Sequence, residues 1–187
     1  MNLYLIRHTT PMVEPSVCYG QSDVGVTEQF DLEAATVHGK LPDLAGIPVY
    51  ASPLDRCRRL AAFLSDQPPR IDARLMEMHF GDWEGRRWAD IDPVALRHWG
   101  DHYVTEGPPN GEAMQTLHER CTHFYAELLT AGHADVLVVT HGGVIRTLLC
   151  HVLALPLDRA FTFHLDFAGV TQILVQDGVS KIMGVNR

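Results

Sequence analysis

The chain has 187 residues, a formal net charge of −8 and a hydrophobic fraction of 46%. This length suits one compact domain and is short for two, and the apolar fraction supplies a core without disulfide bonds or structural metals. The negative charge argues against bulk attraction to nucleic acids or anionic membranes, because both present phosphate groups. We therefore expect one globular domain that binds neither a nucleic acid nor a membrane.

The cysteines and the N-terminal residues bear on the compartment. The first apolar run meets Arg7 and His8 within a few residues, so it is too short for the core of a signal peptide. No stretch approaches the roughly 18 apolar residues of a membrane-spanning helix. The chain has four widely spaced cysteines, Cys18, Cys57, Cys121 and Cys150. No two of them form a Cys-x-x-Cys pair, which favours reduced thiols. We expect a cytoplasmic location.

In chain order, the first predicted elements are two strands and a helix. The apolar runs 2–6 and 47–51 have the length and composition of short buried strands. Ser52 and Pro53 then have the pattern of a helix start, a capping hydroxyl followed by a proline at the first helical position. We expect that helix to continue through Arg56 to about residue 65.

The middle of the chain contains a second helix start and a long amphipathic pattern. Asp92 and Pro93 repeat the helix-start signal. The run 105–111 contains two prolines and two glycines and is the one candidate linker. Between residues 112 and 130 the apolar side chains keep a 3.6-residue period, which predicts a helix that packs on a sheet face.

The last predicted elements define the fold class. Residues 135–140 have a Val-Leu-Val-Val centre typical of a buried strand, and 144–155 predict a more apolar helix. Residues 170–175 and 179–185 predict a strand pair that turns at Asp177-Gly178. Because buried strands alternate with helices, we predict an α/β fold, a three-layer α/β/α sandwich with a mostly parallel central sheet.

Polar residues follow three of the predicted strands, at the sheet edge where open α/β folds bind ligands. Guanidinium groups match phosphate oxygens, and the free amides of a helix N-terminus add donors. Each group alone is typical of an ordinary turn or helix cap, but together they predict a site for a doubly charged anion such as phosphate. The groups are Arg7-His8-Thr9, Ser52-Pro53-Leu54-Asp55-Arg56 and Thr140-His141-Gly142-Gly143.

Four blocks of sequence resemble the histidine phosphatase superfamily, also called the phosphoglycerate-mutase-like family. The resemblance implies a single histidine phosphatase domain over residues 1–187, with a helical and loop insertion near 80–110 over the active site. It also implies a metal-independent phosphomonoesterase that needs no cofactor and acts on a small molecule. The blocks are LIRHT at 5–9, SPLDRC at 52–57, EMHFGDWEG at 77–85 and VTHGGVIR at 139–146.

The resemblance also implies roles for individual residues. His8 corresponds to the nucleophile that becomes phosphohistidine, and Glu77 to the proton donor for the leaving alkoxide. An imidazole attacks only when neutral, so we expect its other nitrogen to donate to a backbone carbonyl or a similar acceptor. The groups that the resemblance places around the transferring phosphoryl are Arg7, Arg56 and His141.

Other residues are weaker candidates for the site. Glu84 is a rival carboxylate seven residues after Glu77, but the family pattern puts the donor at the start of the block. Gln21 and the amide of Gly142 are candidate phosphate contacts. Large aromatic residues more often pack in the protein interior than bind a ligand. Three of them are nevertheless candidates for stacking on a substrate ring: Trp83, Trp99 and Tyr103.

Several features resemble one subgroup, the α-ribazole phosphatases of cobalamin assembly. The subgroup implies α-ribazole 5′-phosphate as the substrate, with a broad-specificity small-molecule phosphatase as the alternative. The features are Thr9 after the Arg-His pair, CYGQ at 18–21, the run 77–84, and PNGE at 109–112.

Three further functions compete with hydrolysis. A metal enzyme is one, because His98 and His102 share a face if their segment is helical, but no His-Glu-x-x-His motif accompanies them. A phosphoglycerate-mutase-type phosphotransferase is another, although such mutases are usually longer than this chain. A phosphate-binding module without turnover is the third. The sequence predicts no oligomeric state.

Overall fold

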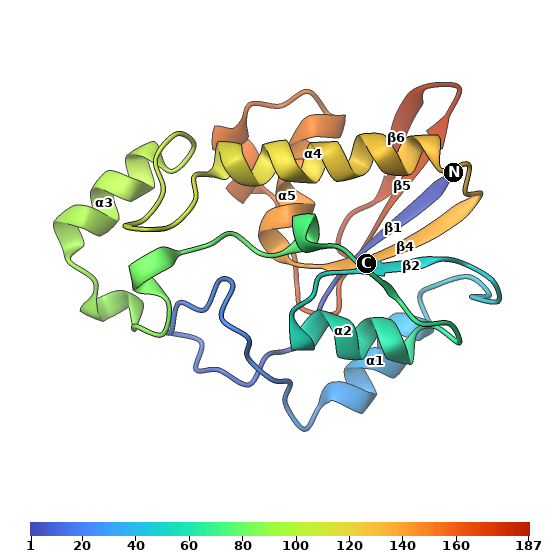
Figure 1. The fold of residues 1–187 in the computed structure, drawn as a ribbon, viewed down its shortest axis with the longest axis horizontal. Coiled ribbons are helices and arrows are strands. Elements are labelled where there is room, and N and C mark those ends of the chain that lie inside the picture. Colours follow the sequence, from blue (N-terminus) through green and yellow to red (C-terminus); the bar gives the residue numbers. More distant parts are fainter.

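A six-stranded mixed sheet forms the centre of the computed structural model, which describes residues 1–187 (Figure 1). The strand order is β3-β2-β4-β1-β5-β6. The parallel strands are β1 (Asn2–Arg7), β2 (Val49–Ala51), β3 (Arg70–Ile71) and β4 (Asp135–Thr140). At the other edge, β5 (Val170–Gln176) runs antiparallel to β1, and β6 (Val179–Gly184) runs antiparallel to β5. The predicted mostly parallel sheet is confirmed.

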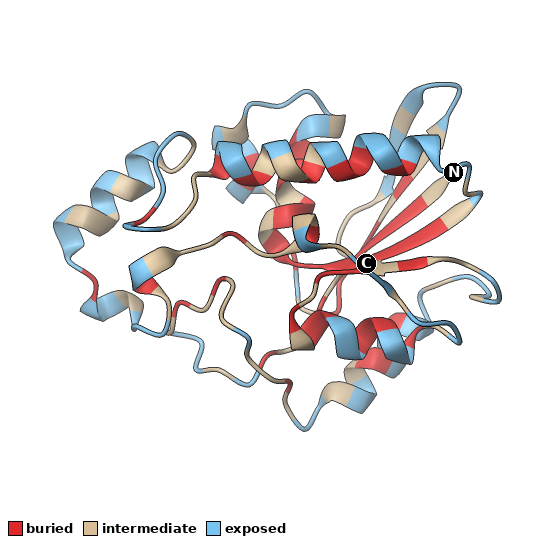
Figure 2. Cartoon of the chain, in the orientation of Figure 1, coloured by how far each residue is buried: buried red, intermediate tan, exposed pale blue.

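Helices cover both faces of the sheet, so the predicted three layers are also confirmed (Figure 1). Helices α1 (Phe30–His38) and α2 (Asp55–Phe63) lie on one face, and α4 (Met114–Thr130) and α5 (Gly142–Val152) lie on the other. Alternate residues of β1 serve the two cores, with Leu5 in the larger cluster and Ile6 in the smaller. Figure 2 shows buried residues on the strands and on the facing sides of the helices.

A third, smaller cluster lies outside the sandwich. It is built on α3 (Pro93–His102) and on two short 3₁₀ helices, Gly81–Trp83 and Trp88–Asp90. Cys18, Trp83 and Ile91 are its buried residues, and Trp99 packs against them. Figure 1 shows α3 to the left of the sheet, beyond the ends of the central strands. Residues 80–103 therefore have a small apolar core of their own.

Most predicted elements match the structure to within a few residues. The first strand extends one residue further, the strand at 135–140 is confirmed, and the second strand is only three residues long. The turn at Asp177-Gly178 is confirmed, with φ values of +51° and +75° that suit a two-residue hairpin loop. Asp92 caps α3 by accepting the N–H of Val94 at 3.0 Å. All four cysteines are free and buried.

The predicted helix start at Ser52-Pro53 is wrong. Helix α2 begins at Asp55, and its N-cap residue Leu54 makes no side-chain cap. The hydroxyl of Ser52 accepts the N–H of Leu54 only at 3.4 Å and lies 2.8 Å from Nε2 of His141, so its shorter hydrogen bond is to the end of β4 rather than to the helix start. The helix-start pattern involves only neighbouring residues, whereas the closest hydrogen-bond partner of the Ser52 hydroxyl, His141, is 89 residues away in the sequence.

Other boundaries also differ from the predictions. Helix α1 and the two-residue strand β3 were not predicted, because α1 buries only Ala34 and Val37 and β3 is exposed. The candidate linker at 105–111 is packed rather than free, since the carbonyl of Pro109 accepts the N–H of Asp82 at 2.9 Å. None of the helices is long and apolar enough to cross a bilayer.

Candidate active site

The ends of β1 and β4 bring two histidines together. Arg7 and Thr140 are in register in this parallel pair, so the next residues along each strand, His8 and His141, emerge side by side. Both imidazoles are buried, and their ring centroids lie 5.1 Å apart. The site thus begins where parallel strands end, as the sequence indicated.

The hydrogen bond of His8 fixes its tautomer. Nδ1 lies 2.7 Å from the carbonyl oxygen of Thr9, and because a carbonyl only accepts, Nδ1 must carry the proton. Nε2 then presents its lone pair. Burial, followed by the nearby charge of Arg56, holds the pKa of His8 well below the usual histidine value, despite the opposing bond to Thr9. The imidazole is therefore neutral at neutral pH, and Thr9 supplies the carbonyl acceptor that we expected.

His141 has partners on both ring nitrogens. Nδ1 lies 3.3 Å from Nη2 of Arg56, and Nε2 lies 2.8 Å from the Ser52 hydroxyl. Because a guanidinium only donates, Nδ1 accepts, and Nε2–H donates to Ser52. Burial, followed by the repulsion that a second protonated imidazole at His8 would exert and by the charge of Arg56, holds the pKa of His141 well below the usual value. This second imidazole is also neutral, and it is fixed in orientation.

Two arginines border the histidine pair without a carboxylate partner. Arg56 is fully buried and donates to the carbonyls of Gly20 at 2.7 Å and Ser22 at 2.9 Å. Arg7 donates to the carbonyl of Leu165 at 2.6 Å and stacks on Phe167, with Cζ 3.9 Å from the ring centroid. In both arginines Nε is buried and has no acceptor. A cation removed from water favours a counter-anion, so this pocket suits an anionic group.

The carboxylate of Glu77 lies at the N-terminus of α5. Its Oε1 accepts the N–H of Met78 at 2.9 Å and the N–H of Gly143 at 3.1 Å. A Cβ atom on Gly143 would overlap Oε1 of Glu77, and one on Gly142 would stand 2.8 Å from Nη1 of Arg146. The glycine pair therefore lets a carboxylate and a guanidinium approach the helix start closely. The amide of Gly142 is in the first helical turn, where no intrahelical acceptor exists.

Glu84, the rival carboxylate, has a different set of partners. It accepts the N–H groups of Gln21 at 2.9 Å, Phe80 at 3.0 Å and Ser22 at 2.6 Å, and also the Ser22 hydroxyl. It thus ties residues 20–22 to the Phe80 segment, and the carbonyls of that same loop hold Arg56. The side-chain amide of Gln21 donates to the carbonyl of Glu77 at 2.9 Å. Glu84 is therefore a loop clamp, whereas Glu77 lies at the N-terminus of α5, the helix that His141 precedes.

An apolar cavity of about 400 Å³ lies beside Phe80. Of the aromatic candidates from the sequence, Trp99 and Tyr103 line it, but Trp83 is buried in the third cluster. The cavity adjoins the α5 N-terminus through Arg146, whose Cζ lies 5.4 Å from the Phe161 ring centroid while its Nη1 borders Gly142. The complete lining is Phe80, Trp88, Trp99, Gly100, Tyr103 and Phe161.

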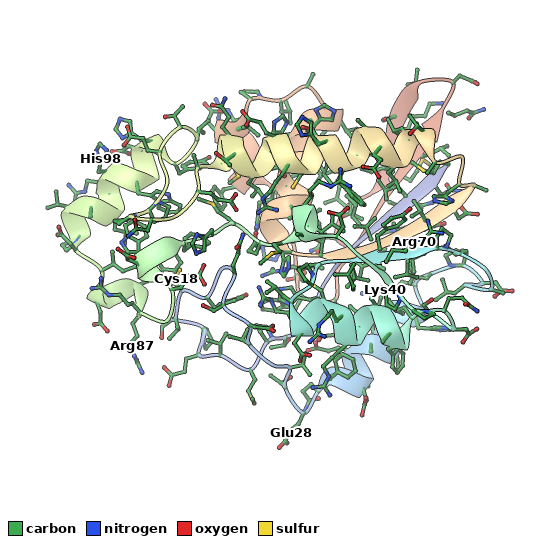
Figure 3. All side chains as sticks on the ribbon, in the orientation of Figure 1. Cys18, Glu28, Lys40, Arg70, Arg87 and His98 are labelled. Carbon is green, nitrogen blue, oxygen red and sulfur yellow. The ribbon has the colours of Figure 1, made fainter.

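The histidines considered as metal ligands lie elsewhere. His98 and His102 stack on α3 with centroids 4.4 Å apart, and Nε2 of His98 is 2.8 Å from a carboxylate oxygen of Glu106. Figure 3 shows His98 on α3, at the left end of the molecule. No group of three or more His, Cys, Asp or Glu side chains is arranged to hold a metal ion.

Sequence reasoning missed several residues of the site. Ser52 was interpreted as a helix cap, and Arg146 stands in a quoted block but received no role. Phe161 lies outside every sequence block of the site, and Trp88 lies in the expected insertion near 80–110 but has no individual role there. The positions of Ser52 and Arg146 in the two strand-end blocks were the one available signal.

Comparisons with known proteins agree with this geometry. A sequence model described as the histidine phosphatase superfamily (branch 1) matches residues 3–187. The adenosylcobalamin/alpha-ribazole phosphatase of Escherichia coli is 31% identical over 174 residues, covering 89% of this chain and 86% of that protein. The glucosyl-3-phosphoglycerate phosphatase of Mycolicibacterium vanbaalenii is 31% identical over 172 residues, covering 84% and 76%. The solved alpha-ribazole phosphatase of Shigella flexneri has a TM-score of 0.91 at 28% identity, covering 100% and 96%.

Proposed function

The chain belongs to the histidine phosphatase superfamily, and we propose that it hydrolyses phosphomonoesters through a phosphohistidine at His8. Nε2 of His8 attacks phosphorus while the ester P–O bond breaks, and Glu77 gives its proton to the departing oxygen. Water then attacks phosphohistidine and transfers a proton to the Glu77 carboxylate, which releases phosphate and restores His8. Arg7 and Arg56 bind the phosphoryl oxygens throughout, and His141 joins them when its Nε2–H exchanges the Ser52 hydroxyl for a phosphoryl oxygen.

One observation carries this proposal: a neutral imidazole with a free Nε2 stands beside two guanidinium groups that have buried, unpartnered Nε donors. The imidazole supplies the electron pair, and the guanidinium groups supply the charge that the phosphoryl oxygens require. Gln21 and the Gly142 amide are proposed as further oxygen contacts. The two guanidinium groups provide the positive charge that a metal ion provides in other phosphatases.

Rapid-quench labelling tests the nucleophile. With a ³²P-labelled phosphomonoester, the enzyme is expected to form an acid-labile, alkali-stable phosphoenzyme. His8→Ala is expected to abolish the label and to lower kcat by on the order of 10⁴-fold or more. The exposed residue His123 on α4 offers a matched control, and His123→Ala is expected to retain both label and turnover. A labelled His8→Ala enzyme would show that another residue is the nucleophile.

The proton donor is tested by the choice of leaving group. Glu77→Gln removes the acidic proton but keeps the side-chain shape, so kcat/KM for glycerol 3-phosphate is expected to fall by about 100-fold. The loss is expected to be much smaller for p-nitrophenyl phosphate, because p-nitrophenolate leaves without protonation. Equal losses for the two esters would exclude Glu77 as the donor.

For the substrate, we propose α-ribazole 5′-phosphate. Two kinds of support agree: relatives named as alpha-ribazole phosphatases match nearly the whole chain, and an aromatic cavity of about 400 Å³ adjoins the anion pocket. Burying about 100 Å² of the benzimidazole, at about 25 cal/mol per Å², contributes about 2.5 kcal/mol, or roughly 70-fold in rate. Within the single domain, residues 80–110 would form the surface that contacts the leaving group of the ester. The four free cysteines support a reducing, cytoplasmic compartment.

A panel of esters tests the substrate proposal. The value of kcat/KM for α-ribazole 5′-phosphate is expected to exceed those for 3-phosphoglycerate and simple sugar phosphates by more than tenfold. Phe161→Ala is expected to reduce this preference, whereas Phe63→Ala, at a similarly exposed ring on α2, is expected to leave it unchanged. If several unrelated esters fall within tenfold of α-ribazole 5′-phosphate, the protein is a broad-specificity phosphatase instead.

A further inference from the structure

The segment that carries Glu77 has no regular secondary structure to hold it. It connects the 3₁₀ helix Ala73–Leu75 to the 3₁₀ helix Gly81–Trp83, and residues 76–80 form neither helix nor strand. The backbone groups here are therefore not satisfied by a sheet ladder. Something else must fix the position of Glu77 relative to the sheet-borne histidines.

A guanidinium group from α4 takes most of this role, beside the side-chain amide of Gln21, which also donates to the Glu77 carbonyl at 2.9 Å. Nη1 of Arg120 donates to the carbonyls of Arg74 and Met76, both at 2.6 Å, and Nη2 donates to the carbonyl of Glu77 at 2.9 Å. Three carbonyls within four residues thus share one side chain. The planar fork of arginine makes this possible, because its donors are fixed relative to one another.

Glu112 holds Arg120 and the same segment. Its Oε1 accepts Nη2 of Arg120 at 2.6 Å and the N–H of His79 at 2.9 Å, while Oε2 accepts Nε of Arg120 at 3.2 Å. The two side chains are only 19% and 14% exposed. Gly111 lets its own segment approach the backbone of His79, since a Cβ atom at residue 111 would stand 2.6 Å from the carbonyl oxygen of His79. The pair therefore clamps the backbone on both sides of Glu77.

From these contacts we infer that Arg120, held by Glu112, is a positioning residue for Glu77. The inference rests on the proposed role of Glu77 as the proton donor. Arg120 sets the main chain of Glu77, and the Gly143 amide sets its carboxylate, so the acid is fixed from two directions. Proton transfer needs a donor within hydrogen-bond reach of the leaving oxygen, and a shift of about 1 Å costs on the order of 100-fold in rate.

The experiment compares two esters in three variants. Arg120→Met removes the three hydrogen bonds to the carbonyls. Glu112→Gln keeps the shape of side chain 112 but removes the negative charge that holds Arg120. Glu119→Gln, at an exposed neighbour on α4, is the control. We expect Arg120→Met to lower kcat for glycerol 3-phosphate by about 30-fold and kcat for p-nitrophenyl phosphate by less than threefold. Glu112→Gln is expected to show the same selectivity with a smaller loss, and KM for phosphate esters is expected to change little.

Coupling to Glu77 separates positioning from a general loss of structure. In the Glu77→Gln background, Arg120→Met is expected to cause almost no further loss for glycerol 3-phosphate, because the donor is already absent. Equal losses for both esters, or full additivity with Glu77→Gln, would overturn the inference while leaving Glu77 as donor. If Arg120→Met does not fold, Glu112→Gln decides by the same two readouts. If Glu77→Gln lowers kcat equally for the two esters, Glu77 is not the proton donor, and the inference about Arg120 is then overturned as well.

Discussion

The site has two halves that are held in different ways. The sheet half consists of Arg7, His8, Arg56 and His141. Arg7 ends β1, the two histidines follow β1 and β4, and Arg56 lies in the first turn of α2, after β2. The loop half consists of Glu77, Gln21 and Glu84, on segments whose backbone is held by side chains such as Arg120. In the proposed mechanism the sheet half binds the phosphoryl group, which all substrates share, and Glu77 of the loop half protonates the leaving group. Substitutions in the sheet half are therefore expected to lower kcat/KM similarly for all esters, whereas substitutions at Glu77 are expected to lower it most for esters with a poor leaving group.

The largest effect is expected from the guanidinium groups of the sheet half. Arg7→Lys and Arg56→Lys replace a planar fork by a single ammonium group, which cannot contact two phosphoryl oxygens in the same geometry. Each change is expected to cost about 2–4 kcal/mol in kcat/KM, or roughly 30- to 1000-fold. The loss is expected to be similar for p-nitrophenyl phosphate and glycerol 3-phosphate. A loss below threefold would place that arginine outside the site.

A smaller effect is expected from the loop clamp. Glu84→Gln replaces an oxygen acceptor by an amide donor, so one of the loop N–H groups loses its partner, and the carbonyls of Gly20 and Ser22 hold Arg56 less firmly. We expect kcat/KM to fall by about tenfold, in keeping with a loss of about 1–2 kcal/mol for one unmade buried hydrogen bond. Glu14→Gln removes an exposed carboxylate that pairs with Arg87, and it serves as the control. Unchanged activity in Glu84→Gln would show that Arg56 holds its position without the clamp.

The buried imidazoles of the sheet half predict a pH dependence of stability. The pKa values of His8 and His141 are held well below the usual 6.5 by burial, so the unfolded chain binds more protons than the folded one once the pH falls below about 6.5. This contribution to stability is fully present above that pH and decreases as the pH falls below it. Urea unfolding at several pH values measures the slope, which is expected to be shallower in His8→Asn and unchanged in His123→Asn. An equal slope in His8→Asn would contradict the burial effect.

The smallest effect is expected from metal removal. Because the two guanidinium groups supply the positive charge, activity is expected to survive incubation with a chelator. Vanadate, which copies the trigonal-bipyramidal phosphoryl group, is expected to inhibit. Activity that is lost on chelation and restored by a divalent cation would revive the metal-enzyme alternative.

The sequence alone is enough to predict the sheet half of the site. Strands 2–6 and 135–140 are short continuous apolar runs, and parallel pairing of such runs brings the residues after them to one edge. Arg7, His8, Arg56 and His141 could therefore be grouped before any coordinates were known. The hairpin at Asp177-Gly178 was also a local property, because the turn residues themselves must adopt positive φ.

The loop half of the site depends on contacts between segments that are distant in the sequence. Glu77 and Glu84 are both carboxylates in one irregular segment, and their separate roles depend on partners at Gly143 and at Ser22, far away in the sequence. Likewise, Ser52 has the pattern of a helix cap but bonds to His141, and Arg120 follows no local motif. Local patterns reflect backbone propensity and periodic burial, whereas a side-chain bond between distant segments arises only when packing brings donor and acceptor together.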